Sequence, residues 1–338
     1  MKAVIVAGGL GTRLRPLTYH RPKHLLPVAN RPFLEYQIAL LRSYGITDIT
    51  FATNYLTELI ESTFGDGGRY GVSLRYVIEK EPLGTAGAIR NALGDDLDDT
   101  VLALNGDVLT DFNLQDLLDF HRQHHAEATI ALSMVRRPHP FGILKLAPDN
   151  RVLDWYEPTE EEKRSANLNP NSVEIEDPIN AGIYVLSAAT VRSIPLRNCS
   201  IEREIYPQMI RDGAPLYGSR HSGFWQDIGR PSQYRAANWA VVERAVKTEV
   251  PWCRIANSAR LANGVMLDER SCIGEGVEID EGARLQECII DCDVRIGSGA
   301  ALSQVVVDRG CVIEEGVVIN GPAVLAAEAK IPRGTLIE

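Results

Sequence analysis

Residues 2–27 of the chain read Lys2-Ala-Val-Ile-Val-Ala-Gly8-Gly-Leu-Gly-Thr-Arg13-Leu-Arg-Pro-Leu-Thr-Tyr-His-Arg-Pro-Lys23-His-Leu-Leu-Pro27. The apolar run at residues 3–7 predicts a buried first strand. The glycines that follow it, at positions 8, 9 and 11, let the backbone turn sharply and approach a ligand closely. Arg13, Arg15 and Lys23 place cations within reach of that turn. We therefore expect this loop to hold a phosphate-rich ligand such as a nucleotide triphosphate.

Strand-like and helix-like patterns alternate through the first two-thirds of the chain. Strands are predicted at residues 2–7, 48–53, 74–79, 100–106, 128–135 and 181–187, and helices at residues 33–44, 87–93 and 114–125. This alternation predicts an α/β fold, with a Rossmann-like, mixed but mostly parallel sheet and flanking helices. Ligands of such sheets bind beyond the carboxyl ends of the strands. The glycine-rich loop and the turn Asn105-Gly106-Asp107 both fall at such ends.

The end of the chain has a different period. Aliphatic residues recur at six-residue spacing, at positions 255, 261, 267, 273, 279 and 285, then 290, 296 and 302, then 307, 313, 319, 325 and 331. The phase slips by one residue before position 290 and again before position 307. Neither a helix nor a hairpin has this period, which is that of the hexapeptide repeat of a parallel β-helix. We predict a left-handed parallel β-helix at residues 251–338, and a linking helix at 231–250 that joins it to an α/β domain at 1–230.

Composition excludes several classes of protein. The formal net charge of −10 argues against nucleic acid as the main partner, because neutralising its phosphates needs a basic face. No apolar run approaches the roughly 20 residues that a membrane-spanning helix requires, so we expect no membrane association. The six cysteines contain no CxxC pair, and they are interpreted as small buried residues of a protein in the reducing cytoplasm.

The opening loop continues into a longer pattern, GGxGTRLxPLTxxxPKxLLPVxxxP, and further motifs follow it in order. They are Glu81-Pro-Leu-Gly-Thr-Ala-Gly87, Leu104-Asn-Gly-Asp-Val108, Ile179-Asn-Ala-Gly-Ile-Tyr-Val185, Ser200-Ile-Glu-Arg-Glu-Ile-Tyr-Pro207 and Gly223-Phe-Trp-Gln-Asp-Ile-Gly229. Together they resemble the sugar-1-phosphate nucleotidylyltransferases, or NDP-sugar pyrophosphorylases. The similarity covers residues 1 to about 245 and is strongest to the branch of the mannose-1-phosphate guanylyltransferases. A hexapeptide tail is also common in that family.

The resemblance implies roles for individual residues. The catalytic group would be Arg13 at the leaving phosphates, Lys23 at the α-phosphate, and Asp107 and Asp227 as ligands of Mg²⁺. Nucleotide binding would involve Gly8, Gly9, Gly11, Thr12, Arg13, Glu81, Gly84 and Thr85. Sugar phosphate binding would involve Gly142, Tyr156, Glu157, Asn180 and Gly182. The segment around Thr85 also reads as a helix start with Thr85 as its cap, and both readings can hold.

The chain departs from the family where the sugar phosphate would bind. The family's Glu-Lys-Pro motif corresponds here to Tyr156-Glu-Pro158, so that Glu157 stands in place of the lysine. An acid beside an incoming phosphate is repulsive, by about 1 kcal/mol or more for unit charges roughly 4 Å apart. Lys145, Lys163 or Arg164 could supply the cation instead, or the sugar pocket is altered, or catalysis is lost. The lysine that is frequent before Asn-Ala-Gly is also missing.

Three functional hypotheses remain at this stage. The first is nucleotidyl transfer from an NTP to a sugar 1-phosphate, with GTP and mannose 1-phosphate or a related hexose or pseudo-sugar phosphate favoured over dTTP, UTP or ATP with glucose 1-phosphate. The second is a catalytically weak homologue that binds a nucleotide sugar and regulates a partner. The third is an acyltransferase on the β-helix. It is disfavoured because such enzymes typically use a histidine as base, and all seven histidines lie at or before His221, outside the repeat region. The open edges of the β-helix predict a homo-oligomer.

Overall fold

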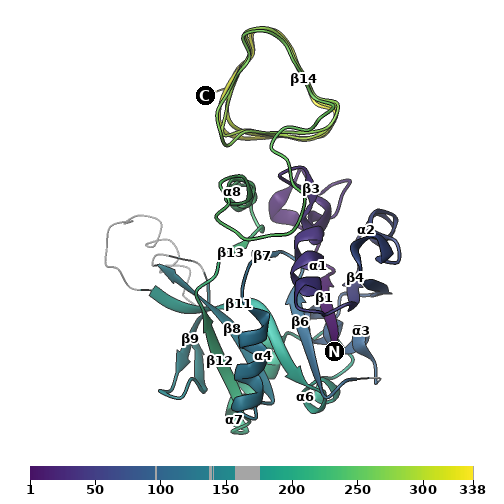
Figure 1. Cartoon of the computed structure of the whole chain (residues 1–338), viewed down its shortest axis with the longest axis vertical. Coiled ribbons are helices and arrows are strands. Elements are labelled where there is room, and N and C mark those ends of the chain that lie inside the picture. The colour runs from purple at the N-terminus through teal and green to yellow at the C-terminus, as the bar shows by residue number, and fades with distance from the viewer. Residues whose placement is uncertain (96, 137–138, 140, 157–175, 338) are drawn as a thin grey trace. The chain divides into compact units, whose positions relative to one another are not determined.

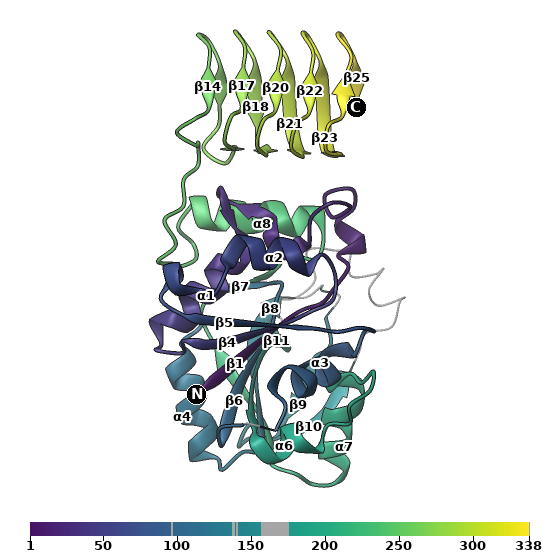
Figure 2. The same cartoon turned by 90° about the vertical axis from the view of Figure 1, so that its right-hand side faces the viewer.

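The computed structural model describes residues 1–95, 97–136, 139, 141–156 and 176–337 (Figures 1 and 2). The chain divides into two compact units. Unit 1 comprises Met1–Gly9 and Leu40–Trp225, and unit 2 comprises Leu10–Ala39 and Gln226–Glu338. The glycine-rich loop is therefore shared, because its first two glycines belong to unit 1 and all that follows Gly9 belongs to unit 2.

Unit 1 is built on a mixed sheet. Strand β1 (Lys2–Ala7) pairs in parallel with β4 (Asp48–Thr53) and with β6 (Thr100–Asn105), and β5 (Ser73–Ile78) continues the parallel part beside β4. Strand β11 (Glu176–Ser187) runs antiparallel to β6 and reverses the direction of the sheet. Four of the six residues of β1 are buried and the other two are half-buried, which explains why this strand is an apolar run after Lys2.

The rest of unit 1 extends and covers this sheet. The remaining strands are β7 (Val108–Thr110), β8 (Ala128–Arg136), β9 (Ile143–Leu146), β10 (Val152–Tyr156) and β12 (Leu216–His221). The helices are α2 (Thr57–Phe64), α3 (Gly84–Leu93), α4 (Leu114–Gln123), α6 (Ala188–Ser193) and α7 (Tyr206–Arg211), with a π-helical turn at Ile201–Ile205. Flanking helices around a mixed sheet confirm the predicted α/β fold. Helix α3 begins three residues before the predicted start, at Gly84.

Helix α1 (Phe33–Ser43) and strand β13 (Trp225–Asp227) run across the boundaries of the two units. Helix α1 ends at Ser43, one residue before the predicted end. Gly45 adopts φ +70°, a conformation that favours glycine, and its N–H donates to the carbonyl of Arg42 at 2.8 Å.

Unit 2 contains the remainder of the glycine-rich loop, helix α8 and a β-helix. The loop carries two 3-10 turns, Thr12–Leu14 and Lys23–Leu25, and a small hairpin of β2 (Pro27–Val28) and β3 (Arg31–Pro32). Helix α8 (Pro231–Val242) lies within the predicted linking helix and is shorter than it.

The repeat region forms stacked coils of parallel strands (Figure 2), and each coil has three sides in cross-section (Figure 1). Its strands are β14 (Arg260–Leu261), β15 (Met266–Leu267), β16 (Cys272–Ile273), β17 (Glu278–Ile279), β18 (Arg284–Gln286), β19 (Ile289–Ile290), β20 (Arg295–Ile296), β21 (Ala301–Val307), β22 (Val312–Ile313), β23 (Val318–Leu325), β24 (Lys330–Ile331) and β25 (Leu336–Ile337). Most of the periodic aliphatic residues, from Ile273 to Leu325, form its buried core, which confirms the predicted β-helix.

The two phase slips mark one corner of this β-helix. Ile273 pairs with Ile290, and Ile290 with Val307, so that these coils close in 17 residues rather than 18. At the shortened corners Glu287 has φ +53° and Gln304 has φ +57°, which lets the chain turn with one residue fewer. Each slip therefore keeps the aliphatic ladder in register.

Candidate active site

The part of the glycine-rich loop in unit 2 folds back on itself. Gly11 has φ +61°, and its carbonyl accepts a hydrogen bond from the Thr18 hydroxyl at 2.9 Å. A Cβ on Gly11 would lie 3.0 Å from Thr18 Cγ2 and 3.3 Å from Lys23 Cβ, so only glycine fits without displacing its neighbours. The fold thus places the backbone of Gly11 against the stem of Lys23, and leaves Thr12 and Arg13 exposed.

A second contact in unit 2 joins two predicted catalytic residues. A Cβ built on Gly229 would lie 3.0 Å from Arg13 Nη2 and 3.0 Å from Asp227 Oδ2, so both side chains flank the same point. Gln233 of α8 donates through its side-chain amide to Asp227 Oδ1. The guanidinium and the carboxylate are thus held at the same place, and Gly229 provides the space they need.

In unit 1, the end of β1 lies beside a carboxylate that the sequence reasoning missed. The Cβ position of Gly8 is 3.4 Å from Asn54 Cβ and 3.8 Å from Glu79 Oε1. Glu79 is 6% exposed, and its Oε2 accepts the N–H of Leu83 at 3.0 Å. Within the described part of the chain, Glu79 Oε1 is buried and has no hydrogen-bond partner. Burial raises the pKa of Glu79 above its ordinary value, against the lowering effect of the bond from Leu83.

The sequence did hold a signal for this residue. Glu79 directly follows β5, which lies in the parallel part of the sheet, and ligands bind at the carboxyl ends of such strands. The predicted residue Glu81, two positions on, is exposed.

The start of α3 is closed by the segment around Cys199. The N–H groups of Ala86 and Gly87 both donate to the Cys199 carbonyl, at 3.0 and 3.4 Å. Gly84 has φ +67°, and a Cβ there would lie 2.6 Å from the same oxygen. The Thr85 hydroxyl accepts the N–H of Ile201 at 2.9 Å, and the N-cap position is Leu83. Thr85 is therefore not the helix cap, and its hydroxyl fastens α3 to the neighbouring turn.

Asp107 lies in the turn between β6 and β7, near a buried polar network. Asn180 donates through Nδ2 to the hydroxyl of Tyr184 at 2.8 Å and to the carboxylate of Glu202. Burial raises the pKa of Tyr184 well above its ordinary value, and the charges of Glu202 and Asp107 add to this. Asn180 Oδ1 accepts the N–H of Gly182 at 2.8 Å. The network therefore holds Asn180 and Gly182 in place near the carboxylate of Asp107.

Aromatic side chains line the same region of unit 1. Trp225 donates through Nε1 to the carbonyl of Ala181 at 2.9 Å and meets Phe141 edge-on at 5.2 Å between ring centroids. A Cβ on Gly142 would lie 2.7 Å from Trp155 Nε1, so this glycine allows Trp155 to pack closely. Tyr156 at the end of β10 is 45% exposed.

The departures from the family motif are only partly in view. Glu157, Lys163 and Arg164 lie outside the described residues. Lys145 on β9 is paired in register with Asp154 on β10. Where the lysine before Asn-Ala-Gly would stand, Asp177 is buried, and its Oδ2 lies 3.1 Å from Nε2 of the equally buried His139.

Comparison with known proteins decides the family. The model of the nucleotidyl transferase family matches residues 2–244, and that of the GMPPB C-terminal domain matches residues 250–338. The chain belongs to the nucleotidyl transferase family. It is 34% identical over 311 residues to mannose-1-phosphate guanylyltransferase of Mycobacterium tuberculosis (strain H37Rv), covering 89% of this chain and 83% of that protein. It is 35% identical over 358 residues to the mannose-1-phosphate guanylyltransferase catalytic subunit beta of Danio rerio, covering 96% of each.

Solved structures support the fold. The crystal structure of HddC from Yersinia pseudotuberculosis complexed with GMP-PN superposes with a TM-score of 0.60 at 24% identity, covering 70% of this nucleotidyltransferase and 97% of HddC. Among the described residues, no helix has the length and apolar character needed to cross a membrane. Within the same residues, no cluster of three or more His, Cys, Asp or Glu side chains is arranged to hold a metal ion.

Proposed function

We propose that this nucleotidyltransferase transfers a guanylyl group from GTP to a hexose 1-phosphate, with mannose 1-phosphate as the favoured acceptor. A phosphate oxygen of the sugar would attack the α-phosphorus of GTP, and the bond to the β-phosphate would break to release pyrophosphate. Both reactants are anions, so catalysis depends on positioning and charge neutralisation. The relatives named above, 34 and 35% identical over most of the chain, support this choice of substrates.

The observation that carries the choice of base is the buried carboxylate of Glu79. Its Oε1 lies beside Gly8, at the start of the glycine-rich loop of residues 8–27, which we call the nucleotide loop. Within the described chain this oxygen lacks a hydrogen-bond partner. Guanine offers two neighbouring donors, N1–H and the 2-amino group. Uracil and thymine offer one N–H between two carbonyl oxygens that a carboxylate would repel. A buried acceptor left unpaired is costly, so this site favours guanine.

On the phosphate side, the proposal assigns charge neutralisation to cations of the loop. Arg13 would bind the leaving β- and γ-phosphates, and Lys23 would stabilise the charge that grows at the α-phosphate. The position of Arg13 supports the first assignment, because its guanidinium and the carboxylate of Asp227 both lie beside Gly229. The other nucleotide-binding assignments stay predictions, namely Gly8, Gly9, Gly11, Thr12, Glu81, Gly84 and Thr85.

We propose Mg²⁺ as the cofactor, with Asp107 and Asp227 each as a ligand. Carboxylate oxygens are the donors that Mg²⁺ prefers, and both side chains are half-buried at strand ends. When bound, the ion would neutralise phosphate charge as a Lewis acid. Asn180 and Gly182 would receive the sugar, because the network with Tyr184 and Glu202 orients them.

Two further assignments rest on the sequence. We propose that the protein acts in the cytoplasm and that it self-associates through the β-helix. Exposed apolar side chains on the outermost coils support self-association, namely Leu261 and Met266 at one end and Leu336 and Ile337 at the other.

The test is a matrix of five NTPs (GTP, ATP, UTP, CTP and dTTP) against sugar 1-phosphates with Mg²⁺, in which pyrophosphate release is measured. Release with GTP and mannose 1-phosphate in clear excess over other pairs supports the proposal. Release with another pair corrects the substrates. No release with any pair, together with measurable GDP-sugar binding, would favour the regulatory homologue. Asp107→Ala is expected to abolish turnover while thermal unfolding stays cooperative.

A further inference from the structure

Arg21 is a basic residue of the nucleotide loop to which nothing above gives a role. It falls at an open position of the pattern GGxGTRLxPLTxxxPKxLLPVxxxP, two residues before Lys23. Its Nη2 lies 2.5 Å from Asp291 Oδ2 and 2.8 Å from Asp308 Oδ1. Both aspartates belong to the β-helix. The three side chains are 16%, 12% and 6% exposed, so the ion pairs are largely shielded from water.

The two aspartates stand one above the other. Ile290 pairs with Val307, and the aspartate that follows each occupies the same position in successive coils. Like charges stacked in register repel one another, and partial burial strengthens that repulsion. Burial raises the pKa of Asp308, and the charge of Arg21 acts against this effect. The guanidinium of Arg21, shared by both carboxylates, offsets the repulsion between Asp291 and Asp308.

We call the pairing of Arg21 with Asp291 and Asp308 the clamp. Arg21 lies two residues before Lys23, the proposed phosphate-binding residue. Pro22 follows Arg21 with φ −64° and begins the 3-10 turn Lys23–Leu25. Because proline fixes its own φ, the backbone from Arg21 to Lys23 is stiff. Holding the Arg21 side chain therefore restrains the place from which Lys23 projects.

The next part of the loop is anchored independently in unit 2. The N–H of Ala29 donates to Asn238 Oδ1 of α8 at 2.8 Å, and its carbonyl accepts from Cys253 N at 3.2 Å. Asn30 donates through Nδ2 to the carbonyl of Ile273 in the first coils at 2.8 Å. Residues 27–30 are thus held by contacts of their own. In the part of the loop that contains Arg13 and Lys23, Arg21 adds two ion pairs with the β-helix.

We propose that Arg21, clamped by Asp291 and Asp308, is a positioning residue that makes the β-helix a structural support for the phosphate-binding part of the nucleotide loop. The β-helix then contributes to nucleotide binding and transfer without touching the substrate. This inference rests on the proposed function only for its kinetic consequence, because the ordering of the loop can be measured without substrate.

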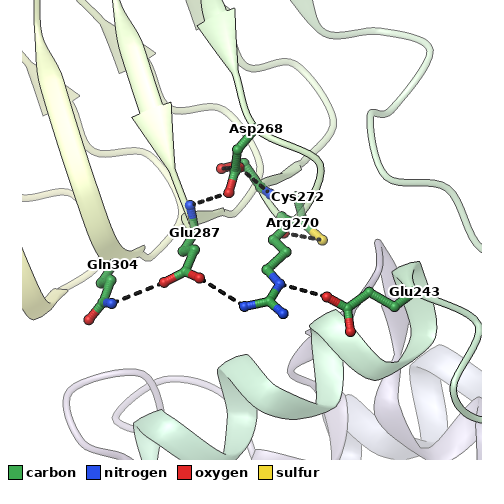
Figure 3. Close-up of polar contacts among 7 residues, drawn as sticks. Glu243, Asp268, Arg270, Cys272, Glu287 and Gln304 are labelled. Atoms are coloured by element: carbon green, nitrogen blue, oxygen red, sulfur yellow. Dashed lines mark hydrogen bonds and ion pairs between the residues drawn. The ribbon is translucent and has the colours of Figure 1, made fainter.

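A second ion-pair cluster of the same β-helix offers a matched control (Figure 3). Arg270 Nε lies 2.6 Å from Oε1 of Glu243, the residue that follows α8, and Arg270 Nη1 lies 2.9 Å from Glu287 Oε1. Gln304 Nε2 donates to the other oxygen of Glu287 at 3.0 Å. The Arg270 guanidinium also lies over the ring of Trp239, 5.0 Å from its centroid. This cluster fastens the β-helix to α8 and not to residues 10–25.

The experiment compares Arg21→Gln, the double variant Asp291→Asn/Asp308→Asn, the conservative Arg21→Lys and the control Arg270→Gln in the full-length protein. Hydrogen exchange of residues 11–26 is measured without ligand. We expect faster exchange in Arg21→Gln and in the double aspartate variant, partial recovery in Arg21→Lys, and wild-type exchange in Arg270→Gln. Unchanged exchange in the first two variants overturns the clamp.

Steady-state kinetics then test the consequence. We expect kcat/KM for GTP to fall at least about tenfold in Arg21→Gln and in the double aspartate variant, equivalent to about 1.4 kcal/mol. The KM for the sugar phosphate should change less than about twofold, since the clamp acts on the loop. Faster exchange with wild-type GTP kinetics refutes the positioning role. If the wild type turns over no substrate pair but the Arg21→Gln and double aspartate variants exchange faster, the clamp is supported and the proposed function is refuted.

Discussion

Glu79→Gln is the substitution that most directly tests the proposed base recognition. Glu79 is 6% exposed, its Oε2 is held by the N–H of Leu83, and its Oε1 faces Gly8. Glutamine keeps the shape and the acceptor for Leu83, but it turns an –NH₂ donor toward the place where guanine presents its own donors. The substitution should therefore leave the fold of the site intact in the absence of nucleotide. In the complex with GTP, the site loses an acceptor for guanine and gains an unpaired donor.

The expected loss follows from that exchange. A hydrogen bond to a charged group contributes about 1.5–3 kcal/mol, and a site with 6% exposure gives water little opportunity to replace it. The kcat/KM for GTP should therefore fall by about 10- to 150-fold. Inosine triphosphate lacks the 2-amino group, so the loss measured with it should be smaller.

The assay is pyrophosphate release with GTP and with inosine triphosphate, for the wild type, Glu79→Gln and Glu58→Gln. Glu58 is an exposed carboxylate on α2 that serves as the matched control. If Glu79→Gln keeps kcat/KM for GTP within about twofold of the wild type, or loses as much with dTTP as with GTP, Glu79 does not read the base.

Three further outcomes test the fold. Gly84→Ala should destabilise the protein by about 2 kcal/mol or more in urea unfolding, because its Cβ would lie 2.6 Å from a carbonyl oxygen at φ +67°. Gly71→Ala, at φ +72° with only the Arg42 side chain nearby at 3.4 Å, should cost only about 1 kcal/mol, and equal losses would contradict the contact. Ile296→Ala should cost about 2–5 kcal/mol and Arg295→Ala on the same strand less than about 0.5, measured in the same way. Burial lowers the pKa of His121 to about 4. The stability that the neutral imidazole contributes is fully present above pH 6.5, and up to about 3 kcal/mol of it should be lost as the pH falls toward 4. Thermal unfolding of His121→Gln should not show this pH dependence.

Much of the fold was predictable because its signals are local. Strand β1 is buried on both faces and reads as an unbroken apolar run, and the six-residue period indicates the β-helix directly. Helix α2 escaped prediction because it begins after Leu56 at φ +49° with no side-chain cap, so the usual start signal is absent.

The site was less predictable because it depends on distant contacts. Glu79 directly follows β5, which is a local signal, but the burial of its carboxylate depends on contacts with Gly8 and Leu83 that the run Glu79-Lys80-Glu81 does not reveal. The ion pair of Arg21 with Asp291 spans 270 positions, and no periodicity reports such a pairing. The proposed phosphate-binding residues are thus predicted from residue type and spacing, whereas the burial of Glu79 and the ion pairs of Arg21 depend on contacts between residues far apart in the sequence.

The division of the loop between the units has a consequence for how the protein is made. Residues 10–39 pack in a unit whose other part begins only at Gln226, which is 226 − 39 = 187 positions later. At about 5–20 residues per second, roughly 10–40 s of synthesis separate the two parts. The first strand and its sheet can form while the ribosome is still working, but residues 10–39 must wait for the later part of the chain that they pack against. A nascent chain released before the β-helix would therefore carry a folded sheet and an unformed nucleotide loop.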